Sequence, residues 1–272
     1  MATYVSYTPT TIIAKAMFNF DAVGIADYKL SGTVNISVSD SFTYLNYLWA
    51  YPSLSFDTYT SLNSGAANWT TTQLANINSI TSTYSQFINL SFSSVANYSG
   101  YTPADVGSYS DINISLLYRT DVTFAGESAL STDTSFGYAY SRGDVVLNLN
   151  GFGPSGLSND YSLSTTSYGG HTLMHEIGHS LGLSHPHSSF NNGSPIITAD
   201  YAATTTLGFN KLGFVISGPA DMNKEYFSIM SYDDQRPLSG VDTYAQTPMI
   251  LDVIALQTAY GEGGGTSGLG ND

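Results

Sequence analysis

The chain contains no cysteine, only seven lysine and arginine residues among 272, and no apolar run long enough to cross a membrane. The missing cysteine excludes a disulfide framework and any latency mechanism that depends on a thiol. With 21 acidic residues and a formal net charge of -14, the chain is a poor partner for nucleic acid, because phosphate binding needs a basic surface. A transmembrane helix needs about 20 consecutive apolar residues, so we expect no membrane-spanning segment and no membrane partner.

All five histidines lie between residues 171 and 187, and three of them belong to the run from His175 to His185. An α-helix has about 3.6 residues per turn, so His175 and His179 project from one face and can share a metal ion. Gly182 can adopt a positive φ, end the helix and turn His185 back towards the other two. The pattern predicts three imidazole ligands and one open coordination position.

The open position indicates the chemistry of the predicted site. Structural zinc sites are normally closed by four protein ligands, whereas three ligands and a water molecule are typical of catalytic sites. Zinc lowers the pKa of its bound water to about 7, and Glu176 is placed to take the remaining proton and pass it to a leaving amine. The metal would also polarise the attacked carbonyl and stabilise the oxyanion. The predicted reaction is hydrolysis of a peptide bond.

The other two histidines, His171 and His187, have no fixed place in this pattern. Each could support a metal ligand, contact a substrate or simply face solvent, and we expect them to face solvent. The pattern His-Glu-x-x-His alone occurs by chance in many helices, whereas the additional Gly182 and His185 at the right spacing make coincidence improbable.

Two alternatives to an active enzyme remain open. A catalytically silent zinc-bearing protein that binds or inhibits a partner would keep the site and lose turnover, and a structural metal domain would use zinc only for folding. The intact Glu176 disfavours the silent protein, and the missing fourth ligand disfavours the structural domain.

A second motif, Ser228-Ile229-Met230-Ser231-Tyr232, follows the histidines. Together the two motifs resemble those of the metzincin metalloproteases, which have a methionine turn beneath the zinc. Pro186 directly after the third histidine and the Ser-x-Met-Ser-Tyr turn narrow the resemblance to the serralysins, which are secreted zinc proteases of bacteria. The stretch from Thr247 to Gly261 is similar to the helix that follows the methionine turn in that family.

The resemblance implies a role for each motif residue. It implies that the zinc ligands are His175, His179 and His185. It also implies that Glu176 is the general base and that Met230 forms a hydrophobic floor beneath the ligands. It also implies that Tyr232 is a movable extra ligand, which leaves the zinc when substrate enters and donates a hydrogen bond to the oxyanion. Without the family, Tyr232 would be one of 21 tyrosines in the chain and Met230 an ordinary core residue.

The resemblance further implies a substrate-binding strand, formed by Gly137, Tyr138, Ala139, Tyr140 and Ser141. This segment would be the edge strand above the active-site cleft and would run antiparallel to bound substrate. The free N–H and C=O groups of such an edge can hold an extended peptide of many sequences. We therefore expect a fairly broad endopeptidase that acts on proteins or peptides; the alternative is a plain edge strand without a role in binding.

Hydrophobic periodicity predicts the elements around these motifs. Apolar residues recur at helical spacing from Thr71 to Ile88, and alternation predicts strands at 33–38, 111–117, 137–141 and 144–149. Leu173, Ile177 and Leu181 should face the core from the zinc helix, and Thr247 and Pro248 should be the N-cap and first-turn residues of a final helix. We expect an α+β, metzincin-like fold with a mixed, mostly parallel twisted sheet, an antiparallel edge strand, an active-site helix and a C-terminal helix.

We expect three parts along the chain. Residues 1–60 form an N-terminal segment that packs on or leads into the catalytic domain, residues 61–261 form the metzincin catalytic domain, and residues 262–272 form a flexible glycine-rich tail. Serralysins usually carry a calcium-binding β-roll after the catalytic domain, but this tail is too short for a stacked coil, so calcium has no support beside zinc.

The composition, rich in Ser, Thr, Asn, Gly and Tyr and poor in charge, is typical of exported bacterial proteins. We expect a secreted, extracellular monomer, although the amino end shows no charged-then-apolar signal from which to read the export route. A proteinaceous inhibitor is a further partner that the resemblance leaves open.

Overall fold

The computed structural model describes part of the chain, namely residues 2–7, 17, 28–39, 69–98, 110–117, 126–129, 144–148, 162–183, 185, 225–231 and 244–263. The chain divides into two compact units, and each is built from separate stretches of sequence. The first unit comprises residues 1–3, 32–82 and 91–180, and the second comprises residues 4–31, 83–90 and 181–272. Among the helices in the described ranges, none is both long enough and apolar enough to cross a membrane.

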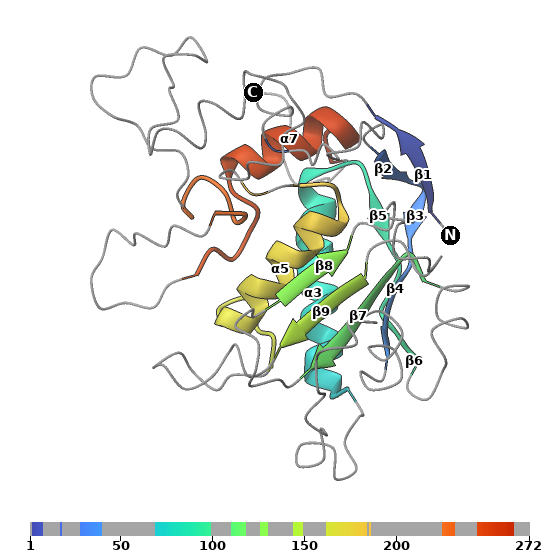
Figure 1. Ribbon diagram of the computed structural model, residues 1–272, viewed down its shortest axis with the longest axis vertical. Coiled ribbons are helices and arrows are strands. Elements are labelled where there is room, and N and C mark those ends of the chain that lie inside the picture. Colours follow the sequence, from blue (N-terminus) through green and yellow to red (C-terminus); the bar gives the residue numbers. More distant parts are fainter. Residues whose placement is uncertain are drawn as a thin grey trace, which may run out of the picture. The chain divides into compact units, whose positions relative to one another are not determined.

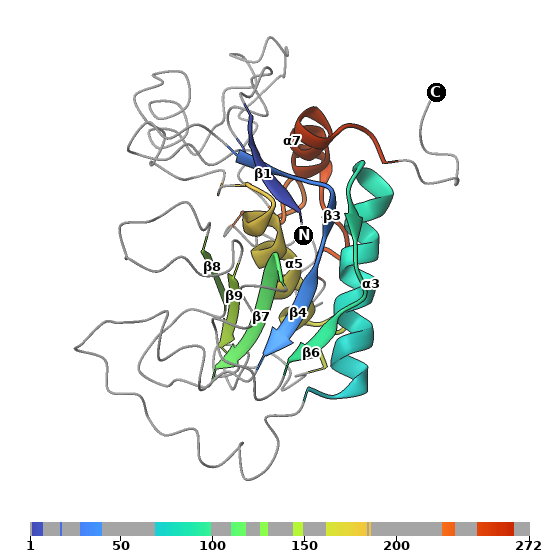
Figure 2. The same cartoon turned by 90° about the vertical axis from the view of Figure 1, so that its right-hand side faces the viewer.

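The first unit contains a five-stranded sheet (Figure 2). In spatial order its strands are β6 (Ala96–Tyr98), β4 (Ile36–Ser39), β7 (Ile112–Leu117), β9 (Asp144–Asn148) and β8 (Gly126–Ala129). The first four are parallel to one another, and β8 pairs antiparallel with β9 at one edge. A mostly parallel sheet with an antiparallel edge strand was predicted and is confirmed.

The strands predicted at 33–38, 111–117 and 144–149 are present in this unit, the first of them divided between β3 (Thr33–Val34) and β4. β3 pairs in parallel with β5 (Ser91–Phe92). The alternating apolar side chains of these strands are fully buried, and they are Val34, Ile36, Val38, Ile112, Ile114, Val145 and Leu147. Ser37 is buried as well, and its hydroxyl is satisfied there, because it donates a 2.9 Å hydrogen bond to Oδ1 of Asn113 on the neighbouring strand.

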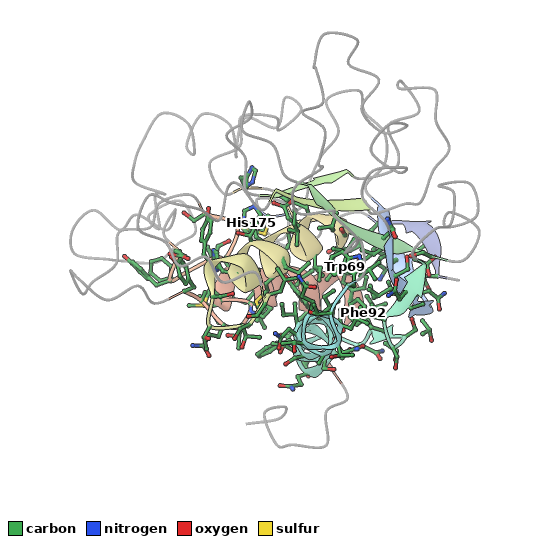
Figure 3. All side chains as sticks on the ribbon, turned by 90° about the horizontal axis from the view of Figure 1, so that it is seen from below. Trp69, Phe92 and His175 are labelled. Carbon is green, nitrogen blue, oxygen red and sulfur yellow. The ribbon has the colours of Figure 1, made fainter. Side chains whose placement is uncertain are left out.

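Two helices lie on the same face of this sheet, α5 (Tyr168–Ser180) and the part of α3 (Thr71–Phe87) that belongs to the first unit (Figure 3). α3 has nearly the bounds predicted for it. It begins with a capping box in which Thr70 Oγ1 accepts the Gln73 N–H at 3.2 Å and Gln73 Oε1 accepts the Thr70 N–H at 2.9 Å. Its buried stripe includes Ile77 and Ile80, at the predicted helical spacing.

The second unit contains a two-stranded sheet of β1 (Thr3–Ser6) and β2 (Tyr28–Ser31) and the helix α7 (Ile250–Tyr260). The predicted start of the last helix, with Thr247 as N-cap and Pro248 in the first turn, is wrong. Met249 is the N-cap, and its backbone N–H donates to the Asp252 carboxylate at 2.8 Å. The helix therefore begins where the carboxylate of its own third residue accepts the N–H of the N-cap residue, rather than at the threonine.

Candidate metal centre

The helix α5 carries two of the predicted ligands and begins at a tightly packed turn. The hydroxyl of Ser167 accepts the Gly170 N–H at 3.1 Å and donates to the carbonyl of Ser164 at 2.8 Å, so Ser167 caps the helix. A Cβ on Gly170 would lie 1.9 Å from that same carbonyl oxygen. Only glycine fits at this position, and the close approach fixes where the helix enters the unit.

α5 packs against β8 and β9 within the first unit, as Figure 1 shows. Nearly the whole helix is buried, including Leu173 and Ile177, which were predicted to face the core. Leu181, the residue after the helix, is buried as predicted. His175 lies on this helix (Figure 3), so a largely enclosed element holds the polar residues of the motif.

His175 and His179 lie one helical turn apart with their ring centroids 4.8 Å from each other. The rings are nearly perpendicular, with an interplanar angle of 83°. His175 is 7% exposed and His179 is half-buried. Two imidazoles from one helix face thus converge, as their four-residue spacing predicts.

The chain leaves the helix after Ser180 and turns at Gly182, whose φ is 106°. This left-handed conformation is costly for residues with a Cβ and open to glycine, and it was predicted for this glycine. Three residues later the half-buried His185 joins the pair, since one ring nitrogen from each of His175, His179 and His185 lies within 4.8 Å of the others. The eleven-residue stretch brings its three histidines together.

This donor set suits zinc. Neutral imidazole nitrogens bind zinc at about 2.0–2.1 Å, which places tetrahedral ligand atoms roughly 3.4 Å apart. Nitrogens that already lie within 4.8 Å of one another reach that spacing by small side-chain movements. Within the part of the chain that the structure describes, the group of His, Cys, Asp or Glu side chains that could hold a metal consists of these three histidines.

Glu176 follows the first of these histidines and is 4% exposed. Its carboxylate oxygen Oε2 is excluded from solvent. A buried carboxyl group can exchange a proton with a neighbouring group without competition from bulk water.

The methionine motif lies in the second unit, where Ser228, Ile229, Met230 and Ser231 are all buried. Asp252 of α7 holds this turn with both carboxylate oxygens. Oδ1 accepts the Ser228 hydroxyl at 2.7 Å, and Oδ2 accepts the Ile229 N–H at 2.8 Å. The Ser228 Oγ in turn accepts the Met230 N–H at 3.0 Å. Met230 is thus fixed by a two-step chain of hydrogen bonds that begins at Asp252.

Burial raises the pKa of Asp252 from 3.8 to about 6. The hydrogen bonds from Ser228, Ile229 and Met249 oppose the rise because they stabilise the carboxylate, but desolvation is the larger effect. Two roles meet in this one residue, which anchors the methionine turn and caps α7 through Met249.

Sequence reasoning was wrong about His171, which was expected to face solvent and is 8% exposed. The residue lies in a helix that is buried almost all round, so no solvent-facing side is left for it. Two other residues of the prediction, His187 and Tyr232, lie outside the described residues. The same is true of the predicted substrate strand, which comprises Gly137, Tyr138, Ala139 and Tyr140. Within the described ranges, the antiparallel edge strand is β8 (Gly126–Ala129).

Three residues around the site were not found from the sequence. Asp252 had a detectable signal, because an acidic residue at the third position of a helix often caps it. Gly170 had none, since the carbonyl that excludes a side chain is six residues away along an irregular turn. Tyr260, which donates a hydrogen bond to Leu181 from 79 residues away, was visible only as part of the family's last helix.

Known proteins give a partial match. No protein-family model matches the chain. Serralysin from Proteus mirabilis is 30% identical over 185 residues, which are 65% of this chain and 32% of that protein. Metallopeptidase AprA from Pseudomonas marginalis is 34% identical over 108 residues, which are 38% of this chain and 20% of that protein. The matched part is thus at most about a third of the length of these relatives.

Among solved structures, the chain is similar to high choriolytic enzyme 1, a hatching enzyme zinc-protease from the medaka fish Oryzias latipes. The comparison covers 93% of this chain and 98% of that one, at 14% identity and a TM-score of 0.34. A TM-score of this size is too low to indicate a shared fold.

Proposed function

Because the chain is serralysin-like in its sequence, we propose that it is a zinc-dependent endopeptidase that hydrolyses peptide bonds of protein substrates. The observation that carries the proposal is the convergence of His175, His179 and His185, whose ring nitrogens lie within 4.8 Å of one another. These three would hold the metal and leave a coordination position for solvent and substrate. When bound, zinc would lower the pKa of a water molecule to about 7 and polarise a substrate carbonyl.

In this proposal Glu176 is the general base. It adjoins His175 in the chain and is almost fully buried, so a proton that it takes from the attacking water is kept from bulk solvent. The same carboxyl group then passes the proton to the amine of the leaving peptide. No covalent intermediate with the protein is needed, and no nucleophilic side chain is assigned.

Met230 is proposed as the hydrophobic floor of the site and Tyr232 as the movable ligand and donor to the oxyanion, both on the strength of the serralysin resemblance. The buried turn around Met230, held by Asp252, supports a fixed position for that methionine. Met230 therefore acts by shape, whereas Tyr232 would act by its hydroxyl.

Substrate is proposed to bind along the antiparallel edge of the sheet as an added strand. The resemblance assigns Gly137, Tyr138, Ala139 and Tyr140 to that edge. Within the described ranges the antiparallel edge strand is β8, which packs next to α5. Main-chain recognition of this kind fits a broad endopeptidase, and we propose secretion to the extracellular medium from the same resemblance.

The test is cleavage of casein by the purified protein, measured together with its zinc content. We expect one zinc per chain, loss of cleavage on chelation, and recovery when zinc is restored. Glu176→Ala should keep the metal and lower cleavage by about a hundredfold or more, while Glu262→Ala, at an exposed glutamate, should cleave normally. Normal cleavage by Glu176→Ala would reject the assigned base.

The same measurements separate the alternative function. A wild-type protein that binds zinc and cleaves neither casein nor a library of peptides would be the silent zinc-bearing binding or inhibitory protein. A wild-type protein that binds no zinc would overturn the proposal altogether.

A further inference from the structure

Tyr260 at the end of α7 joins three segments of the second unit that are far apart in sequence. Its hydroxyl donates a 2.8 Å hydrogen bond to the carbonyl of Leu181 and accepts a 3.1 Å hydrogen bond from the Leu30 N–H on β2. The side chain is 7% exposed. Burial raises the pKa of Tyr260 above its ordinary value of 10.0, so the hydroxyl keeps its proton and remains a donor.

The carbonyl of Leu181, which accepts this hydrogen bond, lies between the end of α5 and the turn at Gly182. Leu181 is the first residue after α5, and the last carbonyls of a helix lack partners within the helix. Gly182 follows with its φ of 106°, and His185 comes three residues later. A fixed Leu181 carbonyl therefore sets the point from which the chain turns towards the third histidine.

Lys29 on β2 also contacts Tyr260. Its Nζ lies 5.5 Å from the ring centroid of Tyr7 and 5.9 Å from that of Tyr260, and it donates a hydrogen bond to the carbonyl of Ala259. The ammonium group thus contacts both rings and the carboxyl end of α7, where the helix dipole favours a positive charge. β2 is thus linked to Leu181 through Tyr260, which contacts Lys29 and hydrogen-bonds to the Leu181 carbonyl.

We propose that Tyr260 is a positioning residue for the third metal ligand, acting through the Leu181 carbonyl on the turn that presents His185. The proposal rests on the proposed zinc site. Tyr260 itself touches neither the metal nor the substrate. Its hydroxyl holds the turn in place before metal arrives, so that less ordering is needed when the third imidazole binds.

Tyr260→Phe tests this, because it removes the hydroxyl and keeps the ring beside Lys29. In the metal-free protein we expect amide hydrogen exchange to rise about tenfold in peptides that cover residues 181–187 and to stay unchanged in β7 and β9. Zinc affinity, measured by competition with a chromogenic chelator, should fall about tenfold to a hundredfold. The visible absorption spectrum of the cobalt-loaded protein should change, because it reports the geometry of the ligands.

Two control variants separate positioning from general loss of stability. Ile80→Val removes one buried methyl group in the first unit and should lower stability while leaving zinc affinity and the cobalt spectrum unchanged. Tyr226→Phe removes a hydroxyl from a tyrosine that is 48% exposed and should change nothing. If Tyr260→Phe behaves like Ile80→Val in all three measurements, Tyr260 has no positioning role.

If Tyr260→Phe fails to fold, Lys29→Ala is the variant to test instead. Its zinc affinity should fall by about threefold to tenfold, and an unchanged affinity would overturn the proposal. The outcomes also stay separate from those of the proposed function. Absence of zinc binding by the wild type would overturn the zinc site, whereas the exchange experiment on the metal-free protein would still decide whether Tyr260 holds the turn at Leu181 and Gly182.

Discussion

Oδ1 of Asp252 accepts the hydroxyl of Ser228 at 2.7 Å, which ties the first turn of α7 to the methionine turn 24 residues earlier in the chain. The other carboxylate oxygen accepts two backbone N–H groups, from Ile229 and Met249. One buried acid therefore satisfies donors in a tight turn and at a helix start, two places where the backbone cannot satisfy itself. The position of Met230 depends on α7 through this residue.

Asp252→Ala should destabilise the protein by about 3 kcal/mol, because two buried donors and one partly buried donor lose their acceptor. Each unsatisfied buried group costs about 1–3 kcal/mol, offset in part by removal of a buried charge. Asp252→Asn keeps the shape and an acceptor oxygen and should stay within about 1 kcal/mol of the wild type near pH 4, where the carboxyl group of the folded wild type is protonated. Urea unfolding of the three proteins measures both values. Equal stability of the alanine variant and the wild type would show that the carboxylate does not hold the turn.

The same residue predicts a pH dependence of stability. Since burial raises the pKa of Asp252 from 3.8 to about 6, the folded state holds this proton more tightly than the unfolded state does. Its stabilising contribution is fully present below pH 3.8 and is lost as pH rises through 6. The interval corresponds to about 3 kcal/mol, at about 1.4 kcal/mol for each tenfold change in the proton equilibrium.

Wild type and Asp252→Asn are the pair to compare, because the other acidic groups titrate alike in both and cancel. The free energy of unfolding of the wild type, minus that of Asp252→Asn, should decrease between pH 4 and 7. A difference that stays constant would mean that the three hydrogen bonds balance desolvation, and one that increases would mean that they outweigh it; in either case the pKa is not raised.

Gly170→Ala should lower the free energy of unfolding by about 2 kcal/mol or more, as overpacking usually does. The added Cβ would lie 1.9 Å from the Ser164 carbonyl oxygen, which is backbone and cannot rotate away. Ser82→Ala, at an exposed position of α3, is the control and should change stability by less than about 0.5 kcal/mol. A Gly170→Ala variant as stable as the wild type would contradict this close approach.

The features that the sequence predicted are those that depend on residues close together in the chain. The bounds of α3, the parallel strands and the turn at Gly182 depend on spacing within a few residues, and the predictions were confirmed. The buried state of His171 depends on what surrounds α5 on every side, which periodicity in one helix does not specify. The start of α7 was misplaced because Thr247 is an acceptable cap locally, whereas Asp252 provides the hydrogen bonds.

Two of the three residues that escaped prediction share one property. Asp252 and Tyr260 act through hydrogen bonds to backbone groups 23 and 79 residues away. A backbone N–H or carbonyl leaves no mark in the sequence that would pair it with a distant side chain. The three histidines were predictable because an eleven-residue stretch contains all of them and one helix turn relates the first two.

Zinc should stabilise the wild-type protein against heat, because a ligand that binds only the folded state adds about 4 kcal/mol when its free concentration is a thousand times its Kd. His185→Ala removes one of the three converging nitrogens and should abolish most of this effect, with little change in the Tm of the metal-free protein. Calorimetry with and without zinc at one fixed concentration measures the difference.

His171→Ala is the matched control, since His171 is a buried histidine of the same helix α5 that is not one of the three converging residues. This variant should lower the Tm of the metal-free protein, because a buried side chain is truncated, and should keep the full increase on addition of zinc. If zinc stabilises His185→Ala as much as the wild type, the third imidazole is not a ligand. If His171→Ala alone loses the increase, the ligand set has been assigned to the wrong histidines.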